Sequence, residues 1–337
     1  MNEIRIIITM DCEPTTATTH PSATGPRDWA QGERAVRGYS EIARSYGFPV
    51  TFFIHPETAM AQAGMFNDLA RAGACLGLHM HPWKYSLWRH EGTRYFAHYG
   101  GLAESEQCAL LQESSALWAE AIGHRPRYFR PGTFSANDAI FKVLAEQGFH
   151  GGSCSAPGRV LREMRAIWTG CEPDPHRGNT EFRQARGGLD FCNMPLSADF
   201  SALLEGRIGR RMHADLRPDV DWPGDYGVSY TTIARNILTQ VQDRVPSVPV
   251  MNTISHNMYE YRDPADATCT RFRLMLDALT EACAKADLHP VGATVADITD
   301  TVLAHSPREE AFVSARVPCS TRSGRSPRRH PMPGNRA

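Results

Sequence analysis

The chain has 337 residues, of which 42% are hydrophobic and 22% are charged, and its formal net charge is −1. This composition suffices for one large α/β domain with a full core, and the nearly balanced charge gives no reason to expect nucleic acid as a partner. The apolar runs are all shorter than the roughly 18 residues that a membrane-spanning helix needs, so we expect no membrane span.

The nine cysteines are an odd number, are scattered along the chain and form no Cys-x-x-Cys pair. This pattern favours reduced thiols over a disulfide framework or a cysteine zinc site. The chain starts with Met1-Asn2-Glu3 and then enters an apolar run, without the pattern of a secretory signal peptide. We therefore expect a cytoplasmic protein.

Segments with strand and helix character alternate along the chain. The expected strands are 4–9, 49–54, 75–79, 128–130 and 248–254. The expected helices are 33–46, 59–72, 104–122, 137–147, 231–243, 268–286 and 295–304. Such alternation is typical of parallel strands with helices packed outside them, so the expected fold class is α/β.

Two stretches depart from this alternation. Residues 154–226 are rich in Gly, Pro and Arg, and we expect a long excursion with little structure of its own, a kind of segment that is often functional. The segment 305–337 carries seven arginines and two acidic residues without apolar periodicity, which predicts a disordered tail. The expected organisation is one barrel domain over residues 1–304 followed by this tail.

Polar residues follow four of the expected strands at their C-terminal ends, where (β/α) barrels carry their active sites. These residues are Asp11 and Glu13, His79 and His81, Arg130, and His256. Each strand end therefore carries a carboxylate, an imidazole or a guanidinium, and the recurrence of polar groups in the same relative place predicts a functional site.

The pair His79 and His81 flanks a single residue, so on an extended segment both imidazoles point to the same side, about 6–7 Å apart. Two imidazoles and one carboxylate form the ligand set of a catalytic zinc site, and the same set suits non-haem iron. Asp11 and Glu13 are also two residues apart and face one way, so that one could bind the metal while the other accepts a proton from water. The alternative for the histidines is that each is hydrogen-bonded separately near a loop. The alternative for the two carboxylates is that they cap a helix or belong to a surface turn.

The roles of the other two strand-end residues are open on residue type alone. Arg130 could orient the base or bind an oxyanion, or form a salt bridge at the barrel mouth. His256 ends an apolar strand, where it could serve as general acid or as a structural histidine.

Taken together, these motifs resemble carbohydrate esterase family 4, the NodB-type polysaccharide deacetylases, over roughly residues 3–300. Thr9-Met10-Asp11-Cys12-Glu13 resembles the first motif of the family, Thr-Phe-Asp-Asp-Gly, and Gly77-Leu78-His79-Met80-His81-Pro82 resembles its histidine motif. Phe129-Arg130-Pro131-Gly132 resembles Arg-x-Pro-Tyr, and Ile254-Ser255-His256 resembles the last motif. The Asp-x-Glu-Pro and Leu-His-x-His-Pro-Trp patterns are similar to a divergent branch associated with lipopolysaccharide biosynthesis.

The resemblance implies a distorted (β/α)7-8 barrel of the polysaccharide-deacetylase type, with the long excursion between its fifth strand and the late strands. It implies that Asp11 is the general base, that Arg130 fixes Asp11, and that His256 is the general acid. It also implies that His79 and His81 bind a divalent metal, zinc in the first place, with cobalt, manganese, nickel or iron as alternatives. Because Cys12 stands where the family has its metal-binding aspartate, we assign the third ligand to Glu13, with Asp11 as the alternative.

Further departures from the family pattern concern spacing and aromatic residues. The histidines are two residues apart instead of four, and Pro131-Gly132 replaces Pro-Tyr. Asp221-Trp222 resembles the aspartate–tryptophan motif but is displaced, so no role is assigned to Asp221 unless Asp11 is the ligand and another base is needed. The segment 83–99 holds six aromatic residues, which could stack on sugar rings or pack locally.

We expect a hydrolase that removes an N-acyl group, in the simplest case N-acetyl, from a sugar or glycan. The first alternative is hydrolysis of a small amide on the same barrel, possibly without metal, because the second aspartate is replaced at Cys12. The second alternative is a glycan-binding protein without catalytic activity. The sequence does not indicate an oligomeric state.

Overall fold

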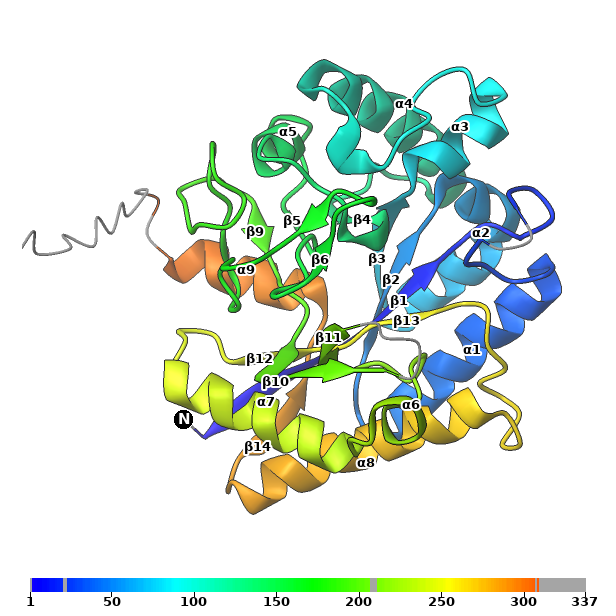
Figure 1. Ribbon diagram of the computed structural model, residues 1–337. Coiled ribbons are helices and arrows are strands. Elements are labelled where there is room, and N and C mark those ends of the chain that lie inside the picture. The colour runs from blue at the N-terminus through cyan, green and yellow to red at the C-terminus, as the bar shows by residue number, and fades with distance from the viewer. Residues whose placement is uncertain (1, 21–22, 207–210, 307, 309–337) are drawn as a thin grey trace, which may run out of the picture.

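The computed structural model describes residues 2–20, 23–206, 211–306 and 308. Strand β1 (Glu3–Cys12) is the longest strand of a curled sheet and pairs with four other strands (Figure 1). On one side it pairs in parallel with β12 (Val250–Asn252) and β13 (Ser255–His256). On the other side it pairs with β14 (His289–Gly292) and β2 (Val50–Ile54).

From β2 the sheet continues through further parallel strands and ends on one antiparallel strand. The parallel strands are β3 (Cys75–Met80), β4 (Tyr128–Pro131), β5 (Gly151–Gly152) and β9 (Cys192–Asn193), and the antiparallel one is β8 (His176–Arg177). The two ends of the curled sheet approach each other at Asn252. Its carbonyl accepts a hydrogen bond from the Ser197 backbone, and its side-chain amide reaches the Pro195 carbonyl and the Ser153 hydroxyl. The expected distorted barrel is thus confirmed.

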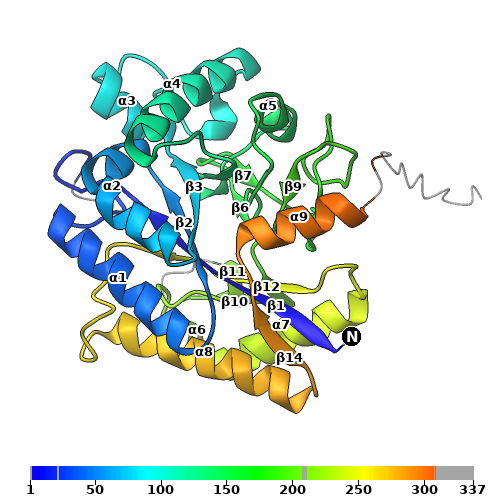
Figure 2. The ribbon, with the colours of Figure 1, turned by 180° about the vertical axis from the view of Figure 1, so that it is seen from behind.

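Helices pack outside the curled sheet (Figure 2). They are α1 (Trp29–Ser45), α2 (Pro56–Arg71), α3 (Pro82–His90), α4 (Glu104–Ile122), α5 (Ile140–Glu146), α6 (Trp222–Tyr226), α7 (Tyr230–Arg244), α8 (Ala267–Lys285) and α9 (Val295–His305). Helix α1 shows why they form: Asp28 caps its N-terminus by accepting from the Gln31 backbone, and Ala35, Val36 and Tyr39 recur on its buried face.

The residues of β1 alternate between two hydrophobic clusters. Ile6, Ile8, Met10 and Cys12 belong to the larger cluster, which also contains the apolar faces of α1, α2 and α8. Ile7 belongs to a second cluster with Phe53, Tyr128 and Cys192 from other strands, and Val295, Ile298 and Val302 of α9 close this cluster. The odd-numbered side of β1 therefore faces the interior of the curled sheet, as the two-residue period of a strand requires.

The predicted excursion contains more structure than expected. The hairpin of β6 (Val160–Leu161) and β7 (Ala166–Ile167) and the hairpin of β10 (Ala198–Glu205) and β11 (Arg211–Asp215) both belong to it. Strand β9 also lies within it, although it is part of the main sheet. A two-residue strand shows no period, so the sequence pattern could not reveal it.

Most of the predicted arginine-rich tail lies outside the described residues; helix α9 extends to His305, and only Ser306 and Arg308 follow it in the described part. In the part of the chain that the structure describes, no helix combines the length and apolar character needed to cross a bilayer.

Candidate functional site

The site lies at the C-terminal end of β1, where the interior side of the strand turns from apolar to polar. Ile7 is followed on this side by Thr9, Asp11 and then Glu13, and all three polar residues are buried. Cys12 lies on the opposite side, in the core under the helices. Burial, followed by the negative charges of Asp11 and Glu13, raises the pKa of the Cys12 thiol well above its ordinary value. Cys12 therefore takes no part in the site.

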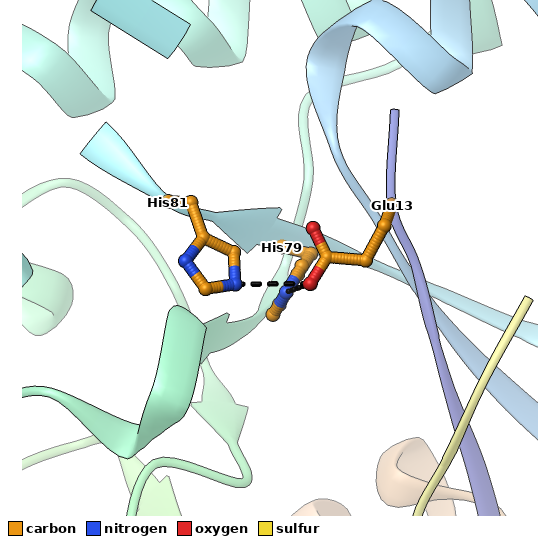
Figure 3. A group of neighbouring side chains, drawn as sticks. All are labelled: Glu13, His79 and His81. Atoms are coloured by element: carbon orange, nitrogen blue, oxygen red, sulfur yellow. Dashed lines mark ion pairs between the residues drawn. The ribbon is translucent and has the colours of Figure 1, made fainter. Parts of the chain in front are cut away.

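Glu13, His79 and His81 converge on one point (Figure 3). The Glu13 Oε1 atom lies 3.0 Å from His81 Nε2 and 3.4 Å from His79 Nε2. One ligand atom from each of the three residues lies within 4.8 Å of the others, and all three residues are buried. Among the described residues, this is the group of His, Cys, Asp and Glu side chains that could hold a metal ion.

Each imidazole is held by the end of β4. The Nδ1 atom of His79 lies 3.1 Å from the Arg130 carbonyl, an acceptor, so Nδ1 carries the proton and Nε2 is left with its lone pair facing Glu13. The His81 ring packs against Gly132, where a Cβ would lie 2.3 Å from His81 Nδ1. A side chain at position 132 would clash with this ring, so the glycine allows His81 to occupy its position.

The second oxygen of Glu13 is bound by a buried lysine that the sequence analysis missed. Lys84 Nζ lies 2.7 Å from Glu13 Oε2, 2.7 Å from the Thr24 carbonyl and 3.1 Å from the Thr24 hydroxyl. Thr24 in turn donates to Glu13 Oε1 at 3.0 Å. Burial raises the pKa of Glu13, but the charges of His81, Lys84 and His79 outweigh it and hold that pKa well below its ordinary value. Glu13 is therefore ionised.

Asp11 is paired with Arg130, as the resemblance implied. Arg130 Nη1 donates to Asp11 Oδ1 at 2.8 Å and to the Thr9 hydroxyl at 2.8 Å. The other oxygen, Asp11 Oδ2, lies 3.9 Å from His79 Nε2. Burial acts to raise the pKa of Asp11, but Arg130, then His79 and His256, lower it below its ordinary value. Asp11 is thus an ionised carboxylate with one oxygen directed toward the histidine pair.

His256 lies at the end of β13, directly paired with Asp11 in register. Its Nδ1 atom lies 2.5 Å from Asp219 Oδ2, while the other oxygen of Asp219 accepts from the Ser255 hydroxyl. Burial lowers the pKa of His256, but the charge and hydrogen bond of Asp219 outweigh it, and the net effect is a raised pKa. His256 is therefore biased toward its protonated form.

Asp219 is a residue of the site that sequence reasoning missed. The displaced motif residue Asp221 caps the short helix α6 by accepting from the Gly224 backbone. The residue that contacts His256 is Asp219, two positions earlier, in the turn that precedes α6. The spacing of acidic residues at 215, 219 and 221 was the available signal, but an irregular segment gives no period from which to choose among them.

The aromatic segment 83–99 is mainly structural. Tyr85, Tyr95 and Tyr99 are buried in the larger core cluster. Trp83 is only partly buried, and its ring centroid lies 6.2 Å from that of His81. Within this segment, Trp83 is the aromatic side chain that contacts a site residue.

The sequence matches the family model for polysaccharide deacetylase over residues 25–152, a segment that includes His79, His81 and Arg130. No curated protein sequence matches the chain.

Several solved structures share the fold. A protein from Mycobacterium smegmatis assigned as a polysaccharide deacetylase has a TM-score of 0.56 and 17% identity, with 92% of this chain and 94% of that chain covered. Puue allantoinase has a TM-score of 0.52 and 13% identity, with 91% and 92% covered. A Pseudomonas aeruginosa PAO1 protein, also assigned to the polysaccharide deacetylases, has a TM-score of 0.51 and 12% identity, with 91% and 93% covered. The chain thus resembles the polysaccharide deacetylases in the segment that the family model matches, and it shares the fold of these solved structures.

Proposed function

We propose that this protein is a metal-dependent hydrolase that removes an N-acyl group, in the simplest case N-acetyl, from a sugar-containing substrate. The observation that supports this most directly is the convergence of Glu13, His79 and His81 next to an ionised carboxylate, Asp11. His256 is paired in register with Asp11, and although burial lowers the pKa of its imidazole, Asp219 outweighs burial and raises it above its ordinary value. A Lewis-acid centre, a base and an acid are the three components that amide hydrolysis requires.

The residues fit a divalent metal. The Nε2 atom of His79 is buried and makes no hydrogen bond, although its ring is fixed through Nδ1. Two neutral imidazole nitrogens and one carboxylate oxygen suit zinc first, and cobalt, manganese, nickel or iron as alternatives. Such an ion would supply a Lewis acid for the acyl carbonyl and for the attacking water.

Glu13 is a better candidate than Asp11 for the carboxylate ligand. Glu13 Oε1 lies within 3.4 Å of both Nε2 atoms, whereas the nearest approach of Asp11 to His79 is 3.9 Å. Because Arg130 occupies Asp11 Oδ1, Asp11 Oδ2 remains to accept a proton from the attacking water. Arg130 thus positions the base, and its charge keeps that base ionised.

His256 completes the reaction as general acid. Asp219 fixes the ring through Nδ1, which leaves Nε2 to donate a proton to the leaving amine. In the overall reaction the amide C–N bond breaks, the oxygen of water bonds to the acyl carbon, and the amine leaves with the proton from His256.

Two substitutions separate the role of base from that of ligand. Asp11→Asn should keep the metal and lose activity by about a hundred- to ten-thousand-fold, because an amide cannot accept the proton. Glu13→Gln should lose metal affinity, and His79→Ala and His81→Ala should do the same. Metal content after dialysis and acetate release from an N-acetylated chitooligosaccharide are the two readouts. Loss of metal in Asp11→Asn with retention of metal and turnover in Glu13→Gln would reverse the assignment.

A second candidate activity is hydrolysis of a small amide. The fold similarity to an allantoinase is compatible with it, but at 13% identity it shows the fold alone. The converging imidazoles favour the metal-dependent reaction instead. Turnover of a small cyclic amide by protein stripped of metal would support this second candidate, and retained glycan affinity without acyl release under any metal would support a binding protein.

We also propose that the protein works in the cytoplasm. The eight cysteines within the described residues are free thiols, and most of them are buried. Free thiols are typical of a reducing compartment. Fractionation of cells that express the native gene would test the location.

A further inference from the structure

The two hairpins of the excursion enclose a cavity of about 320 Å³. The β6–β7 hairpin and the β10–β11 hairpin supply most of its walls, and both lie in front of the curled sheet in Figure 1. Its apolar lining comes from Val160, Leu161, Leu196, Leu203 and Met212. The polar side chains that also line it are Arg159, Arg211, His213 and Asp215.

The cavity lining suits a flexible chain better than a sugar ring. Among the described residues that line it, none is Phe, Tyr or Trp, the side chains that stack on sugar rings. Val160 is 48% exposed and Leu203 is 47% exposed, so aliphatic surface also borders the opening. Exposed apolar surface gathered at a cavity indicates a ligand with apolar parts.

The contact between the hairpins depends on a glycine. Gly158 has a φ of +76°, and a Cβ there would lie 2.6 Å from His213 of β11 and 3.2 Å from Phe200 of β10. The β6–β7 hairpin is anchored from the other side by Trp168, whose indole donates to the Phe134 carbonyl at 2.7 Å. The cavity is therefore fixed by the packing of its walls.

Two side chains that line the cavity, Arg159 and Asp215, are linked by short chains of contacts to residues of the candidate site. The Phe134 ring contacts two guanidinium groups, that of Arg159 at 5.1 Å and that of Arg130, the partner of Asp11, at 5.5 Å from its centroid. Asp215, which also lines the cavity, binds Arg217 at 2.5 Å. Further along the same segment lies Asp219, the partner of His256.

We infer that this cavity binds an aliphatic chain of the substrate while its amide bond lies at the catalytic residues. The inference rests on the proposed function and adds a substrate class, namely sugars that carry an aliphatic chain. The chain could be an N-acyl group longer than acetyl or an alkyl group attached elsewhere on the sugar. In the first case the reaction is the same hydrolysis, with a fatty acid released in place of acetate and the amine leaving with the proton.

Three probes distinguish these sources: methyl N-acetylglucosaminide, octyl N-acetylglucosaminide and N-octanoylglucosamine. A buried methylene contributes about fourfold in affinity, so even partial burial of an octyl chain predicts a gain of at least about tenfold in kcat/KM over the methyl probe. The gain should appear with the octyl glycoside if the chain is an alkyl group, and with N-octanoylglucosamine if it is the acyl group.

The variant Leu203→Glu tests the cavity, and Leu274→Glu is the matched control, because Leu274 is similarly exposed but lies on α8. Leu203→Glu should abolish the gain and leave turnover of the methyl probe unchanged, whereas Leu274→Glu should change neither. Equal kcat/KM for all three probes, or a gain that survives in Leu203→Glu, would overturn the inference.

Binding of the same probes to Asp11→Asn, measured by calorimetry, separates this inference from the proposed function. Suppose that a chain-bearing probe binds, that Leu203→Glu weakens this binding, and that the wild-type protein hydrolyses none of the probes. This result would support chain binding in the cavity and contradict the proposed hydrolase activity. Hydrolysis of the methyl probe without any chain preference would support the activity and contradict the cavity.

Discussion

Lys84 is a buried cation in direct contact with the carboxylate of the candidate metal centre. It is fully buried, and its three N–H groups are all satisfied by Glu13 and Thr24. In the absence of a metal, this cation balances the negative charge of Glu13. The same cation opposes the binding of a divalent ion through Coulomb repulsion.

Substitution Lys84→Met should therefore act in opposite directions on the metal-free and metal-bound protein. We expect the metal-free variant to lose about 3–5 kcal/mol of stability, because a buried carboxylate has lost its partner. Added zinc should stabilise the variant more than the wild type, and zinc affinity should rise about tenfold. Urea unfolding with and without zinc measures both effects. The control is Lys142→Met, which removes an exposed ion pair with Glu104 and should cost at most about 1 kcal/mol of stability. Unchanged stability of metal-free Lys84→Met would contradict this account.

Asp219 should set the alkaline limit of activity. His256 must be protonated to act as general acid, so activity should fall as pH rises through its pKa. Burial lowers that pKa, but Asp219 outweighs burial and raises it above the ordinary value of 6.5. Asp219→Asn should therefore move the alkaline limb of the kcat/KM profile to lower pH. Asp221→Asn, which removes only a helix cap, is the control, and an alkaline limb that did not move in Asp219→Asn would argue against His256 as the acid.

Strand β1 shows how far the sequence pattern could predict an element and its role. Its β-branched run predicted a strand, and the two-residue period predicted that Asp11 and Glu13 share one side, where the structure places them. The same period explains why Cys12 cannot replace an aspartate ligand. By contrast, helix α3 was not predicted, because the segment was interpreted from its aromatic residues and not from its Pro82 start.

Just beyond the last paired residues of β3 and β4, Gly132 packs against the His81 ring. Substitution Gly132→Ala should displace the His81 ring, because a Cβ cannot lie 2.3 Å from Nδ1. We expect zinc affinity to fall at least about tenfold, as measured by competition with a chromogenic chelator. The control is Gly64→Ala in helix α2, where a Cβ meets nothing within 4 Å and alanine should stabilise the helix by about 1 kcal/mol. Equal zinc affinity in Gly132→Ala and wild type would show that Gly132 does not position His81.

At the scale of the whole molecule, the regular elements and the strand-end residues could be predicted, whereas the contribution of the excursion could not. Alternating strands and helices carry local periods, so the arrangement of Asp11, Glu13, His79 and His81 followed from two strand ends, those of β1 and β3. Asp219 and the two hairpins lie between residues 154 and 226, where contacts are made with distant segments and leave no local pattern. The residues that sequence analysis missed are thus those whose positions depend on tertiary contacts.

The central claim is that acyl removal depends on a metal held by Glu13, His79 and His81. The most direct test measures acetate release from an N-acetylated chitooligosaccharide by a single protein preparation in three states. These are the protein before chelation, the protein after removal of the metal and the chelator, and the same protein after addition of one equivalent of zinc. We predict that activity is lost on removal of the metal and returns at one equivalent in the wild type, but does not return in Glu13→Gln. Full activity of the metal-free wild-type protein would contradict the account.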